Sequence, residues 1–302
     1  MVYQNDAPRI KEKKKRSLAA VLADNSFVML AFFCSAVIML LVFYCFDMTP
    51  FGDTTILRMD LYHQYGPLFA ELYERIKSGG SMLYSWNTGL GGTFLGNYFN
   101  YLSSPLAFVI FFFGHKDIPD AIALMILLKA SIASATFTYY IKKTFGRHDH
   151  AAAAFGVLYS FCGFFIAYYW NVMWIGAMAL FPLVVLGLER IINERKPALY
   201  IVVLALTMIS SYYMAMMVCI FMFIYFFIKY FSIDRDDATE GKLLERIKNS
   251  RFLRTAIVFG LASVAAAFLA AFALIPTYFV LKNCSATSDN WPADIKFYFS
   301  IF

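Results

Sequence analysis

Charged residues are scarce in this sequence: Asp, Glu, Lys and Arg together make up 15% of its 302 residues, whereas 61% are hydrophobic and 19% aromatic. Soluble domains average about 25% charged residues, so the polar side chains here are too few to cover a soluble globule of this size. Apolar runs of about 18 residues or more recur along the chain, and such runs are long enough to cross a bilayer as helices. The composition therefore predicts a membrane protein.

Sequence signals for disulfides, structural zinc and nucleotides are also missing. The five cysteines show no CxxC or CxxH spacing, which argues against a disulfide framework or a zinc site. The glycine-rich stretch 89–92 has Phe94 where a dinucleotide motif needs glycine, and no lysine follows as in a P-loop. The net charge of +6 lies in short clusters between apolar runs rather than on one broad face, so nucleic acid is not an expected partner.

The apolar runs and the basic clusters between them predict an all-α polytopic membrane protein with about seven transmembrane helices. The predicted spans are 27–46, 118–141, 151–169, 173–191, 197–210, 213–231 and 255–280. Leaving 94–114 out of this set places the basic clusters at 142–147 and 190–196 on the same side as the basic amino terminus. Lys and Arg are enriched in cytoplasmic segments, so that side is expected to be the cytoplasm.

This topology divides the chain into five parts. Residues 1–26 form a basic cytoplasmic tail that can touch anionic membrane lipid, and 27–46 is the first transmembrane helix. Residues 47–117 form a large first extracytoplasmic loop, 118–280 a six-helix transmembrane bundle, and 281–302 an extracytoplasmic segment that we expect to be truncated.

Two segments of the loop approach the membrane. Residues 66–77 have an amphipathic pattern that suits a helix lying in the interface. Its apolar face is predicted to carry Leu68, Phe69, Leu72, Tyr73 and Ile76, and its other faces Glu71, Glu74, Arg75 and Lys77. The apolar run 106–113 gives only about 12 Å of helix, too short for a hydrocarbon layer of about 30 Å, so a re-entrant segment is expected.

The residues best suited to chemistry begin just after the first span. The stretch 58–65 reads RMDLYHQY and offers Arg58, Asp60, His63 and Gln64. A carboxylate held near apolar surface can accept a proton from an attacking hydroxyl, which makes Asp60 a candidate general base. The alternative is a solvated loop. Asp60 could also ligate a divalent metal, but no second carboxylate is close in sequence, so the cofactor stays undetermined and no metal is indicated.

Further candidates are polar residues at the spans and in the loop. Lys129 lies about ten residues into the second predicted span, where a charge is costly, so it should face the bundle interior, snorkel, pair with a distant acid or bind an anionic ligand. Asn171 follows three aromatic residues that fit an interfacial belt. Trp86, Asn87 and two other loop asparagines resemble sugar-binding side chains, although Trp in such a loop is more often an interfacial anchor. The stretch 148–150, HDH, is expected to be solvated at the cytoplasmic edge.

Several of these stretches resemble one family. The segments DLYHQYGPL (60–68), YSWNTGLG (84–91) and NYxxYLSSPL (97–106) are similar to bacterial YfhO-type membrane proteins. The likeness continues with YSFCGFF (159–165), YWNVMW (169–174), FPLVVLGLER (181–190) and SYYMA (211–215), so it covers most of residues 55–230.

The resemblance implies a C-type glycosyltransferase (GT-C-like) fold in a bacterial cell membrane. Such a protein takes a sugar from a polyprenyl-phosphate donor and adds it outside the membrane to a cell-envelope polymer such as lipoteichoic acid. A carboxylate in the first external loop is catalytic in that fold, and Asp60 occupies the matching position. We assign Arg58 and Lys129 to the donor phosphate and Gln64, Asn87 and Asn171 to sugar or acceptor, with His63 completing the substrate-binding set.

Two other functions fit the same residues. In a membrane transporter or lipid flippase, Lys129 would be a coupling or substrate charge. Few buried charges and no second broken segment to match 105–113 argue against it. The third reading is a non-catalytic partner in envelope assembly.

Overall fold

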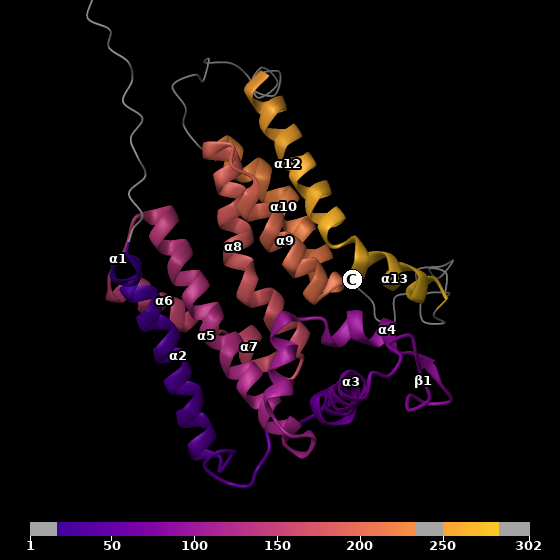
Figure 1. Ribbon diagram of the computed structural model, residues 1–302. Coiled ribbons are helices and arrows are strands. Elements are labelled where there is room, and N and C mark those ends of the chain that lie inside the picture. Colours follow the sequence, from indigo (N-terminus) through magenta and orange to yellow (C-terminus); the bar gives the residue numbers. More distant parts are fainter. Residues whose placement is uncertain (1–16, 233–249, 284–302) are drawn as a thin grey trace, which may run out of the picture.

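The computed structural model describes residues 17–232 and 250–283. Their regular structure is helical apart from one short hairpin, β1 (Tyr84–Ser85) with β2 (Gly92–Thr93), and an isolated bridge. The helices form a bundle, and the segment 47–117 gathers at one of its ends (Figure 1). We call this the polar end, and the opposite end, where the clusters 142–147 and 190–196 lie, the basic end. The predicted tail up to residue 16 and nearly all of 281–302 fall outside the described residues.

Nine helices of the described residues build the bundle, and a short helix, α1 (Leu18–Asp24), precedes them. They are α2 (Ser26–Cys45), α5 (Ile118–Phe145), α6 (His150–Ser160), α7 (Gly163–Tyr168), α8 (Val172–Glu194), α9 (Ala198–Ser210), α10 (Tyr212–Ser232), α12 (Ser250–Leu269) and α13 (Ala271–Lys282). Within the described ranges, six stretches are long and apolar enough to cross a membrane: α2, α5, the α6–α7 pair, α8, α10 and α12.

Six of the predicted spans, which number about seven, correspond to these stretches, and the helices differ from the predicted bounds at two places. The predicted span 197–210 is a helix of 13 residues, about 20 Å long, which is shorter than a hydrocarbon layer of about 30 Å. The predicted span 255–280 breaks at Ala270, after which α13 takes a new direction and reaches the polar end near α4 (Phe94–Asn97) (Figure 1). Apolar residues continue through this break, so hydropathy alone does not reveal it.

Helices α5 and α8 form the centre of the bundle, because each buries side chains along most of its length. Helices α2 and α6 pack against α5, and α9, α10 and α12 pack against α8. Small residues allow close contact: a Cβ at Gly187 of α8 would lie 2.7 Å from backbone atoms of Tyr200 in α9. Hydroxyls also bridge helices, as where Thr136 of α5 donates to the Ala179 carbonyl at 2.8 Å. Both devices are typical of packing inside membranes.

The 47–117 segment folds into short elements instead of one long helix. Helix α3 (Gly66–Ser78) confirms the helix predicted at 66–77 and ends at Gly79 in a left-handed conformation. Residues 105–112 form a 3-10 helix, about 16 Å long at 2.0 Å per residue, which agrees with the prediction that this run does not span. Leu68, Phe69 and Leu72 pack into the same core cluster as α5.

The polar face predicted for α3 is wrong in one respect. Glu71 is only 8% exposed, because the hairpin β1–β2 covers it, whereas Ile76 on the predicted apolar face is exposed. Helical periodicity alone places an acid such as Glu71 on the solvated face. It cannot show that a hairpin later in the chain will cover that acid.

The basic end holds a buried carboxylate in a polar network. Glu189 of α8 is 3% exposed, and its oxygens accept from Thr144 at 2.7 Å, Tyr225 at 2.8 Å and, more weakly, Tyr140 at 3.4 Å. The ammonium of Lys229 lies 2.9 Å from the same carboxylate. The network therefore ties α5, α8 and α10 together.

The HDH stretch (148–150) was predicted to be solvated at this end, but it also packs against the bundle. Both histidine rings pack edge-on against Phe27, each with a centroid separation of 4.9 Å. Asp149 caps α6 by accepting from the Ala152 amide at 2.8 Å and pairs with Arg147 at 2.7 Å. The stretch thus anchors the start of α6 beside α2.

The orientation of the bundle can be tested by labelling. Lys116 lies at the polar end and Arg195 at the basic end, and both are exposed. In a cysteine-free background, we expect Lys116→Cys to react with a membrane-impermeant maleimide in intact cells. The matched variant Arg195→Cys should react only after permeabilisation, because the positive-inside rule places it in the cytoplasm. The reverse pattern would invert the topology.

The Glu189 network should contribute measurably to stability. We expect Glu189→Ala to lower the free energy of unfolding by on the order of 2 kcal/mol, because it removes the acceptor shared by Tyr225, Thr144 and Lys229. Thermal unfolding in detergent measures this loss. Glu194→Ala, which removes an exposed acid one turn further on, is the control and should leave the melting temperature nearly unchanged.

Candidate functional site

The predicted catalytic residue lies in a strained turn at the polar end. Met59 has a φ of 50°, a conformation that is uncommon for residues other than glycine. Asp60 then precedes a π-helical turn, Leu61–Tyr65, without capping it through its side chain. Strained residues and π-turns occur often at functional sites. Asp60 is exposed, and it makes no side-chain hydrogen bond or ion pair to the described residues.

The π-turn connects this segment to the bundle through Tyr65. Its hydroxyl donates to Asn171 Oδ1 at 3.1 Å, and both residues are buried. Burial raises the pKa of the Tyr65 hydroxyl above its ordinary value, and Tyr101 and the Asp60 carboxylate raise it further. The raised pKa keeps the Tyr65 hydroxyl protonated, so it keeps donating to Asn171.

Lys129 reaches the same region from α5. Its side chain is 1% exposed and faces the bundle interior, and its ammonium donates to the Val172 carbonyl at 2.7 Å. Side chains on a helix lean toward its amino-terminal end, which for α5 is the polar end. Gly176 leaves space beside the ammonium, since a Cβ there would lie 3.6 Å from Lys129 Nζ and 3.9 Å from Ser104 Oγ. The predicted residues Lys129 and Asn171 thus meet at the first turn of α8.

An apolar groove of about 430 Å³ lies on one side of the turn. Its walls come from α2 and from the 161–169 region, with residues of the 47–58 segment closing it. Arg58 is the one charged residue among its described lining side chains. The groove is therefore apolar except for the single cation of Arg58.

A polar cavity of about 510 Å³ lies against α3 and the hairpin. It brings together three of the predicted substrate-binding residues, His63, Gln64 and Asn87, which the sequence separates by up to 24 positions. Its other polar lining residues are Glu71, Glu74, Thr88, Asn97 and His115. Trp86, by contrast, does not line the cavity, and its side chain is 77% exposed.

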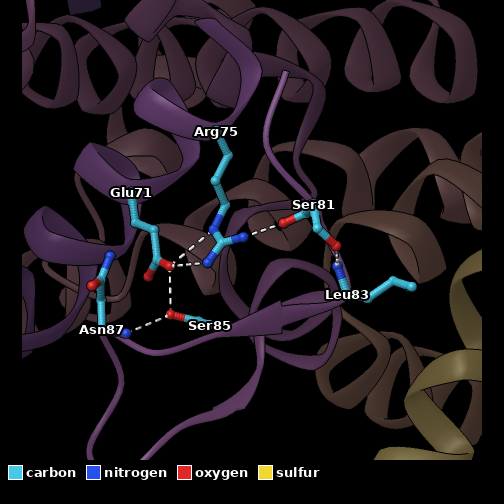
Figure 2. A network of polar contacts seen from close by, with 6 residues as sticks. All are labelled: Glu71, Arg75, Ser81, Leu83, Ser85 and Asn87. Atoms are coloured by element: carbon cyan, nitrogen blue, oxygen red, sulfur yellow. Dashed lines mark hydrogen bonds and ion pairs between the residues drawn. The ribbon is translucent and has the colours of Figure 1, made fainter. Parts of the chain in front are cut away.

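Glu71 anchors the wall of that cavity (Figure 2). Its Oε1 accepts from Arg75 Nε at 2.9 Å, from Arg75 Nη2 at 2.6 Å and from Ser85 Oγ at 2.5 Å. Ser85 Oγ in turn accepts from the backbone N–H of Asn87 at 3.0 Å. Arg75 also donates to the Ser81 carbonyl and covers the Phe94 ring at 4.6 Å. The network fixes the hairpin on α3 and so fixes the position of Asn87.

The sequence reasoning missed three residues of this region. Tyr65 stands in the DLYHQY stretch, where a π-turn brings positions five apart onto one face. No pattern in the sequence predicts that turn. Tyr101, whose ring packs edge-on against Tyr65 at 5.5 Å, carried no signal. Glu71 was assigned to solvent. In the described part of the chain, no group of three or more His, Cys, Asp or Glu residues could hold a metal ion.

Comparisons with known proteins identify the family of this chain. The chain matches the family model described as "Bacterial membrane protein YfhO" over residues 31–302. It is 30% identical over 167 residues to "Uncharacterized protein YfhO" of Bacillus subtilis (strain 168), and this match covers 48% of the chain and 19% of that relative. No solved structure matches. With its multiple candidate transmembrane helices, the chain belongs to the YfhO family of bacterial membrane proteins.

Proposed function

We propose that the chain acts as an inverting membrane glycosyltransferase of the C type, moving a sugar from a polyprenyl-phosphate donor to a cell-envelope polymer such as lipoteichoic acid on the extracytoplasmic face. The observation that carries this proposal is the position of the Asp60 turn. Arg58 at its start lines the apolar groove, and His63 and Gln64 at its end line the polar cavity. One short turn therefore connects a lipid-like site to a sugar-like site.

The apolar groove suits the donor lipid. Its wall on α2 is made of Ile38, Met39, Val42 and other apolar residues. An isoprenoid chain could therefore pack against this wall without burying any polar group of the protein. Arg58 presents several N–H donors, which match the oxygens of a phosphate. In this arrangement the donor phosphate lies two residues from the carboxylate of Asp60.

The polar cavity suits the sugar and the acceptor. Amides, imidazoles and carboxylates from His63, Gln64, Asn87 and Glu74 can donate to and accept from hydroxyl groups. Such a mixed set is needed for a polyhydroxylated ligand, because each hydroxyl both donates and accepts.

The chemistry uses Asp60 as the base. The acceptor oxygen attacks the anomeric carbon, and the bond from that carbon to the phosphate oxygen breaks. The lipid phosphate leaves with the electron pair, stabilised by Arg58, while the proton of the acceptor hydroxyl passes to the Asp60 carboxylate. Attack opposite the leaving group inverts the sugar. No nucleotide site is needed, because the donor is lipid-linked.

Lys129 takes a different role from the one the resemblance implied. It lines neither cavity, so we propose that it positions the site. Its bond to Val172 holds the first turn of α8, and Asn171 in that turn accepts from Tyr65. The Asp60 turn is thereby fixed against the bundle.

Asp60→Asn tests the base directly. In a host that lacks its own copy of the protein, we expect sugar on the envelope polymer to fall by about 100-fold or more, because the amide cannot accept the proton. The control is Asp53→Asn, which neutralises another exposed acid of the same segment and should leave the sugar content unchanged. Normal glycosylation by folded Asp60→Asn would end the assignment.

Arg58→Gln tests the donor site. The neutral side chain should raise the KM for the polyprenyl-phosphate donor by about tenfold, because a charge-assisted contact to phosphate is lost. The KM for the acceptor should change little. Lys116→Gln, which removes an exposed cation away from the groove, is the control; an equal effect of both variants would mean a general loss of surface charge.

A transporter remains the second candidate, and the buried ammonium of Lys129 is the observation that favours it. Counterflow of a labelled polyprenyl-phosphate sugar in proteoliposomes separates the two functions. Movement of the donor without any transfer, abolished in Lys129→Met, would support transport. Transfer that depends on Asp60 would support the enzyme.

A further inference from the structure

A second pair of cavities lies at the basic end, far from the Asp60 turn along the bundle. A polar cavity of about 170 Å³ opens between α5, α8 and α10. Its charged lining residues are Lys143, Glu189, Arg190, Glu194 and Lys229. The proposed transfer reaction uses none of them.

The charges of this cavity leave an excess of positive groups. Glu189 is paired with Lys229 at 2.9 Å, and Glu194 with Lys196 at 2.7 Å. Among the described residues, neither Lys143 nor Arg190 has a carboxylate within ion-pair distance. Lys143 only approaches the face of the Tyr139 ring, at 5.4 Å. The pKa of the Glu194 carboxyl is lowered mainly by its hydrogen bond to Lys196 and further by Arg190, so Arg190 is partly engaged with an acid while Lys143 is not.

A separate apolar crevice of about 210 Å³ lies next to the polar cavity along α8, on the side toward the middle of the bundle. It is lined by aromatic rings together with Pro182 and Val185 of α8. Tyr140 and Tyr225 join the two cavities: their rings line the crevice, and their hydroxyls donate to Glu189, which lines the polar side. The stretch 181–190 contributes to both cavities.

We infer that the two cavities form one binding site for an anionic glycerophospholipid of the adjacent leaflet. The phosphate lies between Lys143 and Arg190, and an acyl chain occupies the aromatic crevice. A cationic site stacked on an apolar crevice matches a lipid, whose charged head and apolar chain are covalently joined, better than a soluble anion, which would leave the crevice unused. Basic pockets between membrane helices on the cytoplasmic side are known to bind such headgroups.

Native mass spectrometry of the chain in detergent tests this site. The probes are phosphatidylglycerol and phosphatidylcholine with identical acyl chains, and inorganic phosphate serves as competitor. We expect one phosphatidylglycerol to bind in preference to phosphatidylcholine. The double variant Lys143→Gln, Arg190→Gln should weaken phosphatidylglycerol binding by about tenfold or more, because each cation near a headgroup contributes to affinity.

Matched variants make the result specific. Arg147→Gln with Arg195→Asn removes two exposed cations of the same end that do not line the cavity, and should leave binding unchanged. Val185→Phe should fill the crevice and weaken phosphatidylglycerol binding, while thermal unfolding reports whether it still folds. Equal losses in both charge variants, equal binding of phosphatidylcholine, or full displacement by inorganic phosphate with no effect of Val185→Phe would each overturn the proposal.

Discussion

Hydrocarbon offers no hydrogen bonds, so a polar group that enters the bundle is costly unless it finds a partner inside the protein. The organisation of this fold follows from that constraint. At the polar end, the ammonium of Lys129 is satisfied by the first turn of α8, and Asn171 in the same turn is satisfied by Tyr65. At the basic end, the Glu189 carboxylate accepts hydrogen bonds from side chains of α5 and α10. In both places a costly polar group selects one arrangement of helices over others of similar hydrophobicity.

The polar end shows how the same constraint produces a site. Tyr65 must be buried to reach Asn171, and this draws the π-turn against the bundle. Asp60, one residue before that turn, stays exposed as a consequence. The groove containing Arg58 and the cavity containing His63 and Gln64 then lie on its two sides. The anchoring residues are therefore distinct from the residues that face a ligand.

Much of this could be predicted from the sequence, because long apolar runs and basic clusters are local signals. The spans at α2, α5, α8 and α10 and the helix α3 follow from them. The short helix α9 and the break at Ala270 could not be predicted, since composition does not change there. Asp60, His63 and Asn87 could be proposed as site residues because they stand in polar stretches. Glu71 was misjudged because its cover comes from a hairpin more than ten residues later. Tyr65 was overlooked because a π-turn has no periodic sequence pattern.

The shortness of α9 has a consequence for the membrane itself. Residues 98–102 pack over the end of this helix, and Ser103 donates to the Ile209 carbonyl there at 2.5 Å. Short, broken helical turns at such a depth are tolerated only where protein or water covers their unpaired backbone groups. Helix α9 is about 10 Å shorter than a typical hydrocarbon layer, and residues 98–102 cover its end. A short helix covered in this way leaves the polar end nearer the middle of the bilayer than a full-length span would, so any ligand of that end has to approach the bilayer closely.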